Sequence, residues 1–240
     1  MKLNIPETSP VLLPGLEDQI LFLLNNVDVT DKRILIMGPG SLHIADKLLA
    51  NGASAIELII DDEELMLADR LQAKASEKLR IRYMEFFSTD FKDESFDLVY
   101  AQASVSTTKH MKILKEIKRI TKPQGSICLG ELVQLTKEIP ASVRNVWERT
   151  KVRPHEIIKL QEAYASQGFE PVLETDLSFT MKFVYKKHLY TMNKHLPSMT
   201  EAEKKVYKKE IKTYRHEANM YLQFKGDNYT GFIVFLMRKP

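Results

Sequence analysis

Apolar and polar residues alternate in blocks over the first 176 residues of this 240-residue chain. Short apolar runs, which suit buried strands, are followed by stretches with apolar residues at helical spacing. Strands that alternate with helices build a parallel sheet with right-handed crossovers. The pattern therefore predicts an α/β fold whose mostly parallel sheet is flanked by helices. The predicted strands are Arg33–Met37, Ala55–Ile60, Leu79–Glu85, Phe96–Tyr100, Ser126–Leu132, Phe169–Asp176 and Thr230–Arg238.

Helix start and stop signals lie between these strands. Gly52 and Gly168 each follow a helical pattern, as a glycine at a helix C-terminus does. Lys122–Gly125 has the composition of a turn that ends the helix before it. The predicted helices are a first one with apolar residues from Leu16 to Val27, then Ser41–Asn51, Asp62–Ala75, Thr108–Thr121 and Pro154–Gln167.

Two segments fall outside the alternation: Val133–Arg153, which holds the only tryptophan, and Leu177–Asn228 between the last two strands. The second is too long for a structureless loop in a compact domain. Thr200 and Glu203 form a capping-box pair, which marks the start of a helix. We therefore expect a helical insertion with one apolar, tyrosine-rich stripe. The stripe consists of Val206, Tyr207, Ile211, Tyr214, Ala218 and Tyr221.

A glycine turn follows the first predicted strand, and an acidic pair follows the second. The turn is Gly38-Pro39-Gly40, and the acids are Asp61 and Asp62. A strand, glycine turn, helix and second strand form a βαβ unit that lets a ligand approach the backbone, and the acid can hold a ribose. This mechanism is shared by adenosine-containing cofactors, so the stretch alone does not choose among them.

Composition indicates one globular domain in a reducing compartment. Apolar residues make up 44% of the chain and charged residues 28%, which is ordinary for a soluble protein. A single cysteine rules out a disulfide framework, and no cluster has the spacing of metal ligands. The chain shows no secretory signal and no apolar run of membrane-spanning length, so we expect a cytoplasmic protein.

Four segments, in order, resemble the class I (Rossmann-like) S-adenosylmethionine-dependent methyltransferases. They cover about Lys32–Leu132 and read ILIMGPGSLHIA, IIDDEEL, MEFFSTDFKDESFDLVYAQ and LKEIKRITKPQGSICLGEL. The resemblance implies a three-layer sandwich with a seven-stranded, mostly parallel sheet and an antiparallel last strand. It also implies a single domain, 1–240. Its parts would be an N-terminal helical segment (1–30), a cofactor-binding core (31–132) and substrate-cap insertions (133–153 and 177–228).

The same resemblance implies that S-adenosylmethionine is the cofactor and S-adenosylhomocysteine the product. Asp61 would hold the ribose hydroxyls, with Asp62 as the fallback, because a carboxylate accepts two hydroxyl protons at once. Helix N-terminal charge is the alternative interpretation of these acids. The other residues implied at the cofactor are Gly38, Pro39 and Gly40 beneath it, Glu85 and Phe86 at the adenine, and Ala101 and Gln102 on the methyl-transfer side.

Two positions depart from the family's first motif. Ile36 stands where an acid is usual, and Leu42 stands where a third glycine is usual. A binding or scaffold protein that has lost catalysis is therefore an alternative function. A nicotinamide-dependent oxidoreductase is another, although His43 occupies the third glycine position of that fingerprint.

The methyl acceptor is expected to be a small molecule, bound beneath the insertion. Met181–Ala218 holds ten Lys and Arg against four Glu, but no nucleic-acid-binding motif accompanies them. RNA methylation is thus a secondary alternative, and a homodimer is left open. His110 and Glu131 are candidate bases near the expected mouth, although cap or surface positions explain them better. No catalytic residue follows from the sequence.

Overall fold

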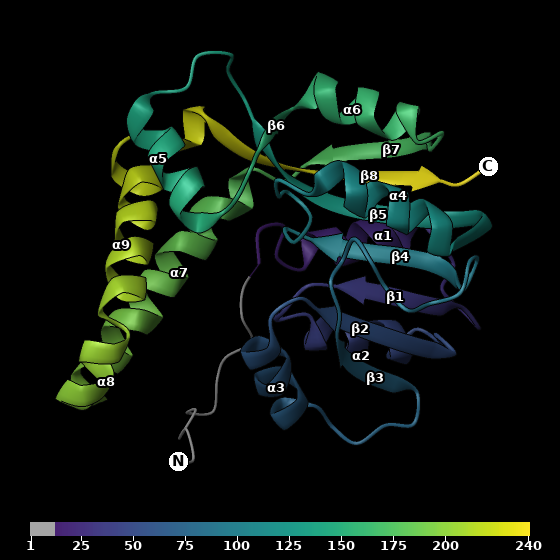
Figure 1. Ribbon diagram of the computed structural model, residues 1–240, viewed down its shortest axis with the longest axis horizontal. Helices are drawn as coiled ribbons and strands as arrows, with labels where there is room; N and C mark the ends of the chain where they lie inside the picture. Colours follow the sequence, from purple (N-terminus) through teal and green to yellow (C-terminus); the bar gives the residue numbers. More distant parts are fainter. Residues whose placement is uncertain (1–12) are drawn as a thin grey trace.

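Eight strands, one more than predicted, form one sheet within residues 13–240, the part of the chain that the computed structural model describes (Figure 1). Their order across the sheet is β3-β2-β1-β4-β5-β8-β7, and the two-residue β6 pairs with the end of β5. The first twelve residues, part of the predicted segment 1–30, lie outside this description. The strands are β1 Arg33–Met37, β2 Ala55–Ile60, β3 Leu79–Tyr83, β4 Phe96–Gln102, β5 Thr121–Gln134, β6 His155–Glu156, β7 Glu170–Asp176 and β8 Thr230–Arg238.

All pairings on the β3 side of β5 are parallel, whereas β8 runs antiparallel to both β5 and β7. The predicted α/β architecture with an antiparallel last strand is therefore confirmed. Strand residues alternate between two cores: Ile34 and Ile36 face one, and Leu35 and Met37 face the other. A strand whose faces are both covered has few polar positions, which is why β1 reads as a continuous apolar run.

Helices cover both faces of the sheet and extend beyond one end of it. Residues of α1, α2, α3 and α7 pack into one core, and residues of α4 and α6 pack into the other. Every helix within residues 13–240 is too short or too polar to cross a bilayer. The helices are α1 Asp18–Asn26, α2 Leu42–Ala50, α3 Glu63–Gln72, α4 His110–Ile120, α5 Ala141–Thr150, α6 Ile157–Ser166, α7 Phe179–His195, α8 Glu201–Val206 and α9 Lys208–Gln223, with 3₁₀ turns at Leu196–Ser198 and Gly226–Asn228.

The segment from Lys122 to Gly125 differs from its prediction as a turn before strand five. Strand β5 begins at Thr121, and residues 122–125 form a bulge within it. Gln124 adopts a positive φ of 61°, and its amide donates to the carbonyl of Lys239 at 2.8 Å. The carbonyl of Lys239 thus accepts the hydrogen bond of the bulge. The sequence around residues 122–125 does not predict this contact.

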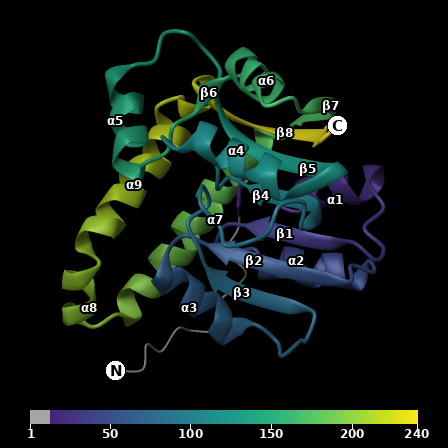
Figure 2. The same cartoon turned by 45° about the vertical axis from the view of Figure 1, so that its right-hand side comes forward.

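The insertion is helical, as predicted, and its capping box at Thr200 and Glu203 is confirmed. Helices α7 and α9 lie side by side beyond the carboxyl end of the sheet, with α5 against the upper part of α9 (Figures 1 and 2). The predicted single stripe is only half correct. Ala218 and Tyr221 are buried, but Val206 is 70% exposed because the helix breaks at Tyr207 and α8 turns away.

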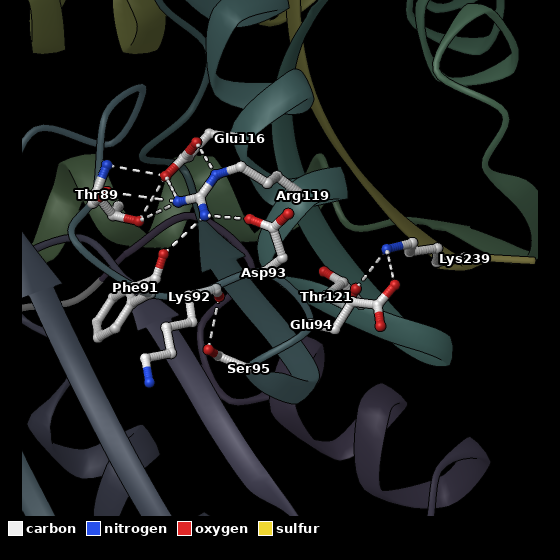
Figure 3. A network of polar contacts seen from close by, with 10 residues as sticks. All are labelled: Thr89, Phe91, Lys92, Asp93, Glu94, Ser95, Glu116, Arg119, Thr121 and Lys239. Carbon is white, nitrogen blue, oxygen red and sulfur yellow. Dashed lines mark hydrogen bonds and ion pairs between the residues drawn. The ribbon is translucent and has the colours of Figure 1, made fainter.

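A charged cluster joins the loop before β4 to α4 (Figure 3). Arg119 of α4 donates to the Glu116 carboxylate at 2.6 and 3.0 Å, and to Asp93 and the Phe91 carbonyl at 2.7 Å each. Glu116 also accepts from the Thr89 amide at 2.9 Å. This cluster fixes residues 89–93 at the amino end of the sheet.

Candidate functional site

The carboxyl ends of β1, β2, β3 and β4 meet at one edge of the sheet because these strands run parallel. This edge collects the glycine turn after β1, Asp61 after β2, Glu85 after β3 and Ser104 after β4. The strand order reverses direction at β1 and β4, and in open α/β sheets ligands bind outside such a switch point.

The glycine turn has a conformation that only glycine adopts without strain. Gly38 has a φ of +122° and Gly40 a φ of +73°. A Cβ atom on Gly38 would lie 2.7 Å from Cβ of Ser104, whose hydroxyl donates to the Met37 carbonyl at 2.6 Å. The loop after β4 is therefore packed directly onto the turn, and Gly38 is required by both its φ and this close approach.

Asp69 is a site residue that the sequence did not reveal. It lies on α3 and is 7% exposed, and its carboxylate accepts a hydrogen bond from the Gly40 amide at 3.1 Å. Burial raises the pKa of the Asp69 carboxyl, and the Gly40 amide offsets part of that effect. Asp69 thus places a carboxylate against the glycine turn. Ile36, which stands where the family usually has an acid, is buried in the apolar core. The only sequence signal is its position three residues after Met66, on the buried face of the helix.

Two substitutions of Asp69 separate the effect of its hydrogen bond on stability from the effect of its charge. Asp69→Ala leaves the Gly40 amide without its acceptor and is expected to lower the free energy of unfolding by about 1–2 kcal/mol. Asp69→Asn keeps an acceptor oxygen and removes the charge. A raised folded-state pKa means that ionisation costs stability as pH rises above 3.8, the ordinary aspartate value.

Asp69→Asn should therefore match the wild type at pH 3.5 and equal or exceed its stability at pH 7, as judged by urea denaturation. Equal losses of stability in the Asn and Ala variants at pH 7 would contradict the role assigned to this hydrogen bond.

The two acids after β2 have different tasks. Asp62 is the N-cap of α3, and its carboxylate accepts from the Leu65 amide at 3.0 Å. Asp61 is exposed, and no other residue of 13–240 donates a hydrogen bond to its carboxylate. Partial desolvation raises the pKa of Asp61, and the neighbouring carboxylates of Asp62 and Glu85 add to the effect. An exposed carboxylate whose negative charge lacks a donor from another residue can accept hydrogen bonds from hydroxyl groups of a ligand.

At the end of β3, Glu85 and Phe86 point in different directions. Glu85 is partly exposed and pairs with Lys109 at 3.2 Å. Phe86 is 3% exposed and packs into the core beside α4. The aromatic ring on the open side is that of Phe87, over which the Lys109 ammonium lies 3.9 Å from the centroid. Glu85 therefore reaches the edge of the sheet, whereas the ring of Phe86 forms part of its support.

Ala101 and Gln102, at the end of β4, are both buried. The Gln102 amide donates to the carbonyls of Pro14 and Leu16 at 2.8 and 2.9 Å, and its oxygen accepts from Tyr100 at 2.6 Å. The structure thus commits the Gln102 side chain to holding the segment before α1. The two residues that follow, Ala103 and Ser104, are both half-buried.

Comparison with known proteins agrees with this geometry. Residues 35–129 match the family model described as a methyltransferase domain. This part of the chain is thus similar to a methyltransferase domain. The match runs from β1 through the first part of β5, which spans the glycine turn, the acids after β2 and the loop after β4. No match was found among curated protein sequences.

Solved structures similar to this chain share its fold at low identity. The [4+2]-cyclase SpnF has a TM-score of 0.75 and 19% identity over 93% of this chain and 80% of its own. Phosphoethanolamine N-methyltransferase 2 of Haemonchus contortus has a TM-score of 0.76 and 15% identity over 95% and 54%. Geranyl diphosphate C-methyltransferase of Streptomyces coelicolor A3(2) has a TM-score of 0.67 and 13% identity over 94% and 78%.

Two buried polar atoms without partners lie close to the glycine turn in the sequence. Ser41, the residue after Gly40, is 1% exposed, and its hydroxyl has no hydrogen-bond partner among residues 13–240. Nδ1 of His43, on the first turn of α2, is likewise buried and unpartnered. Buried polar groups are normally satisfied, so these atoms suit a polar ligand at the turn. The residues present therefore fit an adenosine-containing cofactor.

His110 and Glu131 do not occupy the cap or surface positions that explained them from sequence. His110 is 4% exposed and Glu131 is fully buried, and the two form a hydrogen bond of 2.8 Å. The strand pattern concealed this because a buried glutamate at a strand end looks the same in sequence as a solvated one.

Proposed function

We propose that this protein is an S-adenosylmethionine-dependent methyltransferase that acts on a small-molecule acceptor. The observation that carries the proposal is the meeting of Gly38, Gly40, Asp61 and Glu85 at one edge of a methyltransferase domain. The H. contortus structure contains S-adenosylhomocysteine, and so does the S. coelicolor structure, both with small-molecule substrates named beside it. These proteins support the choice of cofactor by analogy of fold.

The proposed cofactor supplies the reactive group, because a sulfonium methyl is already electrophilic. The residues of this chain hold it. The Asp61 carboxylate accepts the ribose hydroxyls, and the partly exposed Glu85 accepts from the adenine amine. The glycine turn, supported by Asp69, faces the amino-acid portion of the cofactor. What remains for the protein is to place the acceptor in line with the methyl and to exclude water.

The insertion, residues 177–228, is proposed to cap the acceptor, together with residues 133–153. Its interior is packed rather than hollow: Tyr185 donates to Glu217 at 2.7 Å, and only about 40 Å³ of space lies between α5, α7 and α9. The aromatic residues between these helices therefore hold the cap together. The acceptor would lie between the cap and the carboxyl edge of the sheet.

Isothermal titration with S-adenosylmethionine and S-adenosylhomocysteine tests the function. Binding of either at micromolar concentration, followed by transfer of a labelled methyl group to a member of a small-molecule panel, is the expected result. Binding without transfer to any acceptor would favour the scaffold alternative, which rests on Ile36 and Leu42. No binding of either compound at millimolar concentration would overturn the proposal.

Asp61→Asn is expected to weaken S-adenosylhomocysteine binding by about 10- to 100-fold, because a charged acceptor of two hydroxyl protons becomes a neutral one. Only the ionised carboxylate accepts both protons. Since the pKa of Asp61 is raised, wild-type affinity should fall as pH decreases through that raised value, while the affinity of the variant changes little.

Asp62→Asn is the matched control for this substitution. Asparagine is as good an N-cap as aspartate, so α3 and the affinity should both be preserved. A loss of affinity in Asp62→Asn equal to that in Asp61→Asn would show that the ribose acid is misassigned.

A further inference from the structure

The loop between β4 and α4, residues 103–109, lies along the proposed cofactor site from one end to the other. At its start, Ser104 packs on Gly38 and donates to the Met37 carbonyl. At its end, Lys109 pairs with Glu85 at 3.2 Å. The β4–α4 loop therefore contacts the glycine turn and the acid after β3, two features proposed to hold opposite parts of the cofactor.

A buried carboxylate lies directly behind this loop. Glu131 of β5 accepts hydrogen bonds from the hydroxyl of Ser106, from Nε2 of His110 at 2.8 Å and from the hydroxyl of Tyr164 at 3.0 Å. All four side chains are at most 4% exposed. Three donors on one buried carboxylate are a costly arrangement unless every member is satisfied, and such networks fix a single geometry.

The three donors differ in what they hold. Ser106 lies within the β4–α4 loop, and its hydroxyl also accepts from the Leu132 amide at 2.9 Å. His110 is the residue immediately after the loop, at the start of α4. Tyr164 belongs to α6 and not to the loop, although its ring lies 6.2 Å from that of His110. One carboxylate thus ties both the middle and the end of the loop to β5.

A second contact strengthens the same anchor. The Arg153 amide donates to the carbonyl of Ser106 at 2.8 Å, which joins the loop to the segment before β6. The ring of His155 in β6 lies 5.2 Å from that of His110, and its Nε2 is buried without a partner. The loop is therefore supported from behind by β5 and β6 before any ligand arrives.

We propose that Glu131 is a positioning residue for cofactor binding: through Ser106 and His110 it sets the β4–α4 loop against Gly38 and Glu85. A loop ordered in advance spares the ligand the entropy of ordering it, which raises affinity without a contact to the ligand. The affinity part of this inference rests on the proposed function, whereas the anchoring of the loop does not.

Two substitutions remove one hydroxyl each from the same carboxylate and form a matched pair. Ser106→Ala cuts the link to the loop, and Tyr164→Phe cuts the link to α6. Ser106→Ala should weaken S-adenosylhomocysteine binding about tenfold and speed amide hydrogen exchange in residues 103–109. Tyr164→Phe should leave both unchanged, although it also leaves Glu131 short of one donor. Glu131→Gln, which alters both loop contacts at once, should resemble Ser106→Ala.

Equal effects of Ser106→Ala and Tyr164→Phe on affinity and loop exchange would overturn the proposal, because the network would then act only on general stability. If the wild type binds no S-adenosylhomocysteine, the proposed function fails. Exchange in the ligand-free variants still decides whether Glu131 anchors the loop. If Ser106→Ala does not fold, the comparison of Glu131→Gln with Tyr164→Phe carries the test.

Discussion

Gly38→Ala should abolish measurable S-adenosylhomocysteine binding and lower the free energy of unfolding by about 3 kcal/mol. Two costs add up. Alanine is strained at a φ of +122°, and its Cβ would lie 2.7 Å from Cβ of Ser104. Either the turn or the β4–α4 loop must move, and both border the proposed cofactor site. Urea denaturation and isothermal titration measure the two effects separately.

Gly52→Ala is the control for backbone strain alone. Gly52 has a φ of +95°, but a Cβ there would meet only Thr30 atoms at an ordinary 3.5 Å, far along the chain from the turn. We expect a loss of about 1 kcal/mol and unchanged binding. Adding Ser104→Gly to Gly38→Ala removes the clashing atoms and should restore part of the lost stability. No restoration would show that the clash is not what destabilises the variant.

Arg119→Met should lower the free energy of unfolding by about 2–3 kcal/mol. Removing one member of a fully buried charged pair lowers the free energy of unfolding by more than this. Arg119 is partly exposed, and solvent therefore reduces the expected loss. The substitution leaves Glu116, only 10% exposed at its side chain, without its cation. It also frees the Phe91 carbonyl and Asp93, so the loop before β4 keeps only the contacts with α4 that do not involve the Arg119 side chain, such as the bond from Thr89 to Glu116 (Figure 3).

The same cluster predicts a pH dependence of stability. Burial alone would raise the pKa of Glu116, but hydrogen bonds from Arg119 and Thr89 bring it below the usual value of 4.5. A lowered folded-state pKa stabilises the fold above pH 4.5, and this contribution disappears as pH falls through the lowered value. The wild type should therefore lose stability in acid more steeply than Arg119→Met.

Arg82→Met is the matched control for Arg119→Met, because Arg82 pairs with Asp90, whose side chain is 63% exposed. Exposed pairs contribute about 0–1 kcal/mol, so this variant should remain close to the wild type. Similar losses in the two arginine variants would contradict the importance assigned to burial of Glu116.

The strands were predictable where their pattern is set locally. β1, β2 and β8 begin and end at the predicted residues, because their apolar runs are buried on both faces and bounded by polar residues. The start of β5 was not predictable, because the Gln124 amide in its bulge donates to the carbonyl of Lys239, which is far away in the sequence. The two-residue β6 has no periodicity to detect and exists only because His155 pairs with Val133.

The site was predictable only in part. Asp61 and Glu85 reach the carboxyl edge because any residue after a parallel strand does so. Their neighbours were harder to assign. The side chains of Phe86 and Gln102 are buried instead. Whether a side chain at the edge points inward or outward depends on the residues packed against it, and these come from distant parts of the sequence. Asp69 and Glu131 are polar residues in apolar surroundings, and only their distant partners account for them.

The sequence by itself determined the α/β architecture, the glycine turn with its following acid, and the helical insertion, because each rests on periodicity, backbone conformation or capping within a few residues. The tertiary structure alone decided which polar groups meet. The contacts of Asp69 with Gly40, of Ser104 with Gly38 and of Glu131 with Ser106 join residues 25 to 66 positions apart. Such contacts form only when sheet order and helix packing bring separate segments together, so no local pattern encodes them.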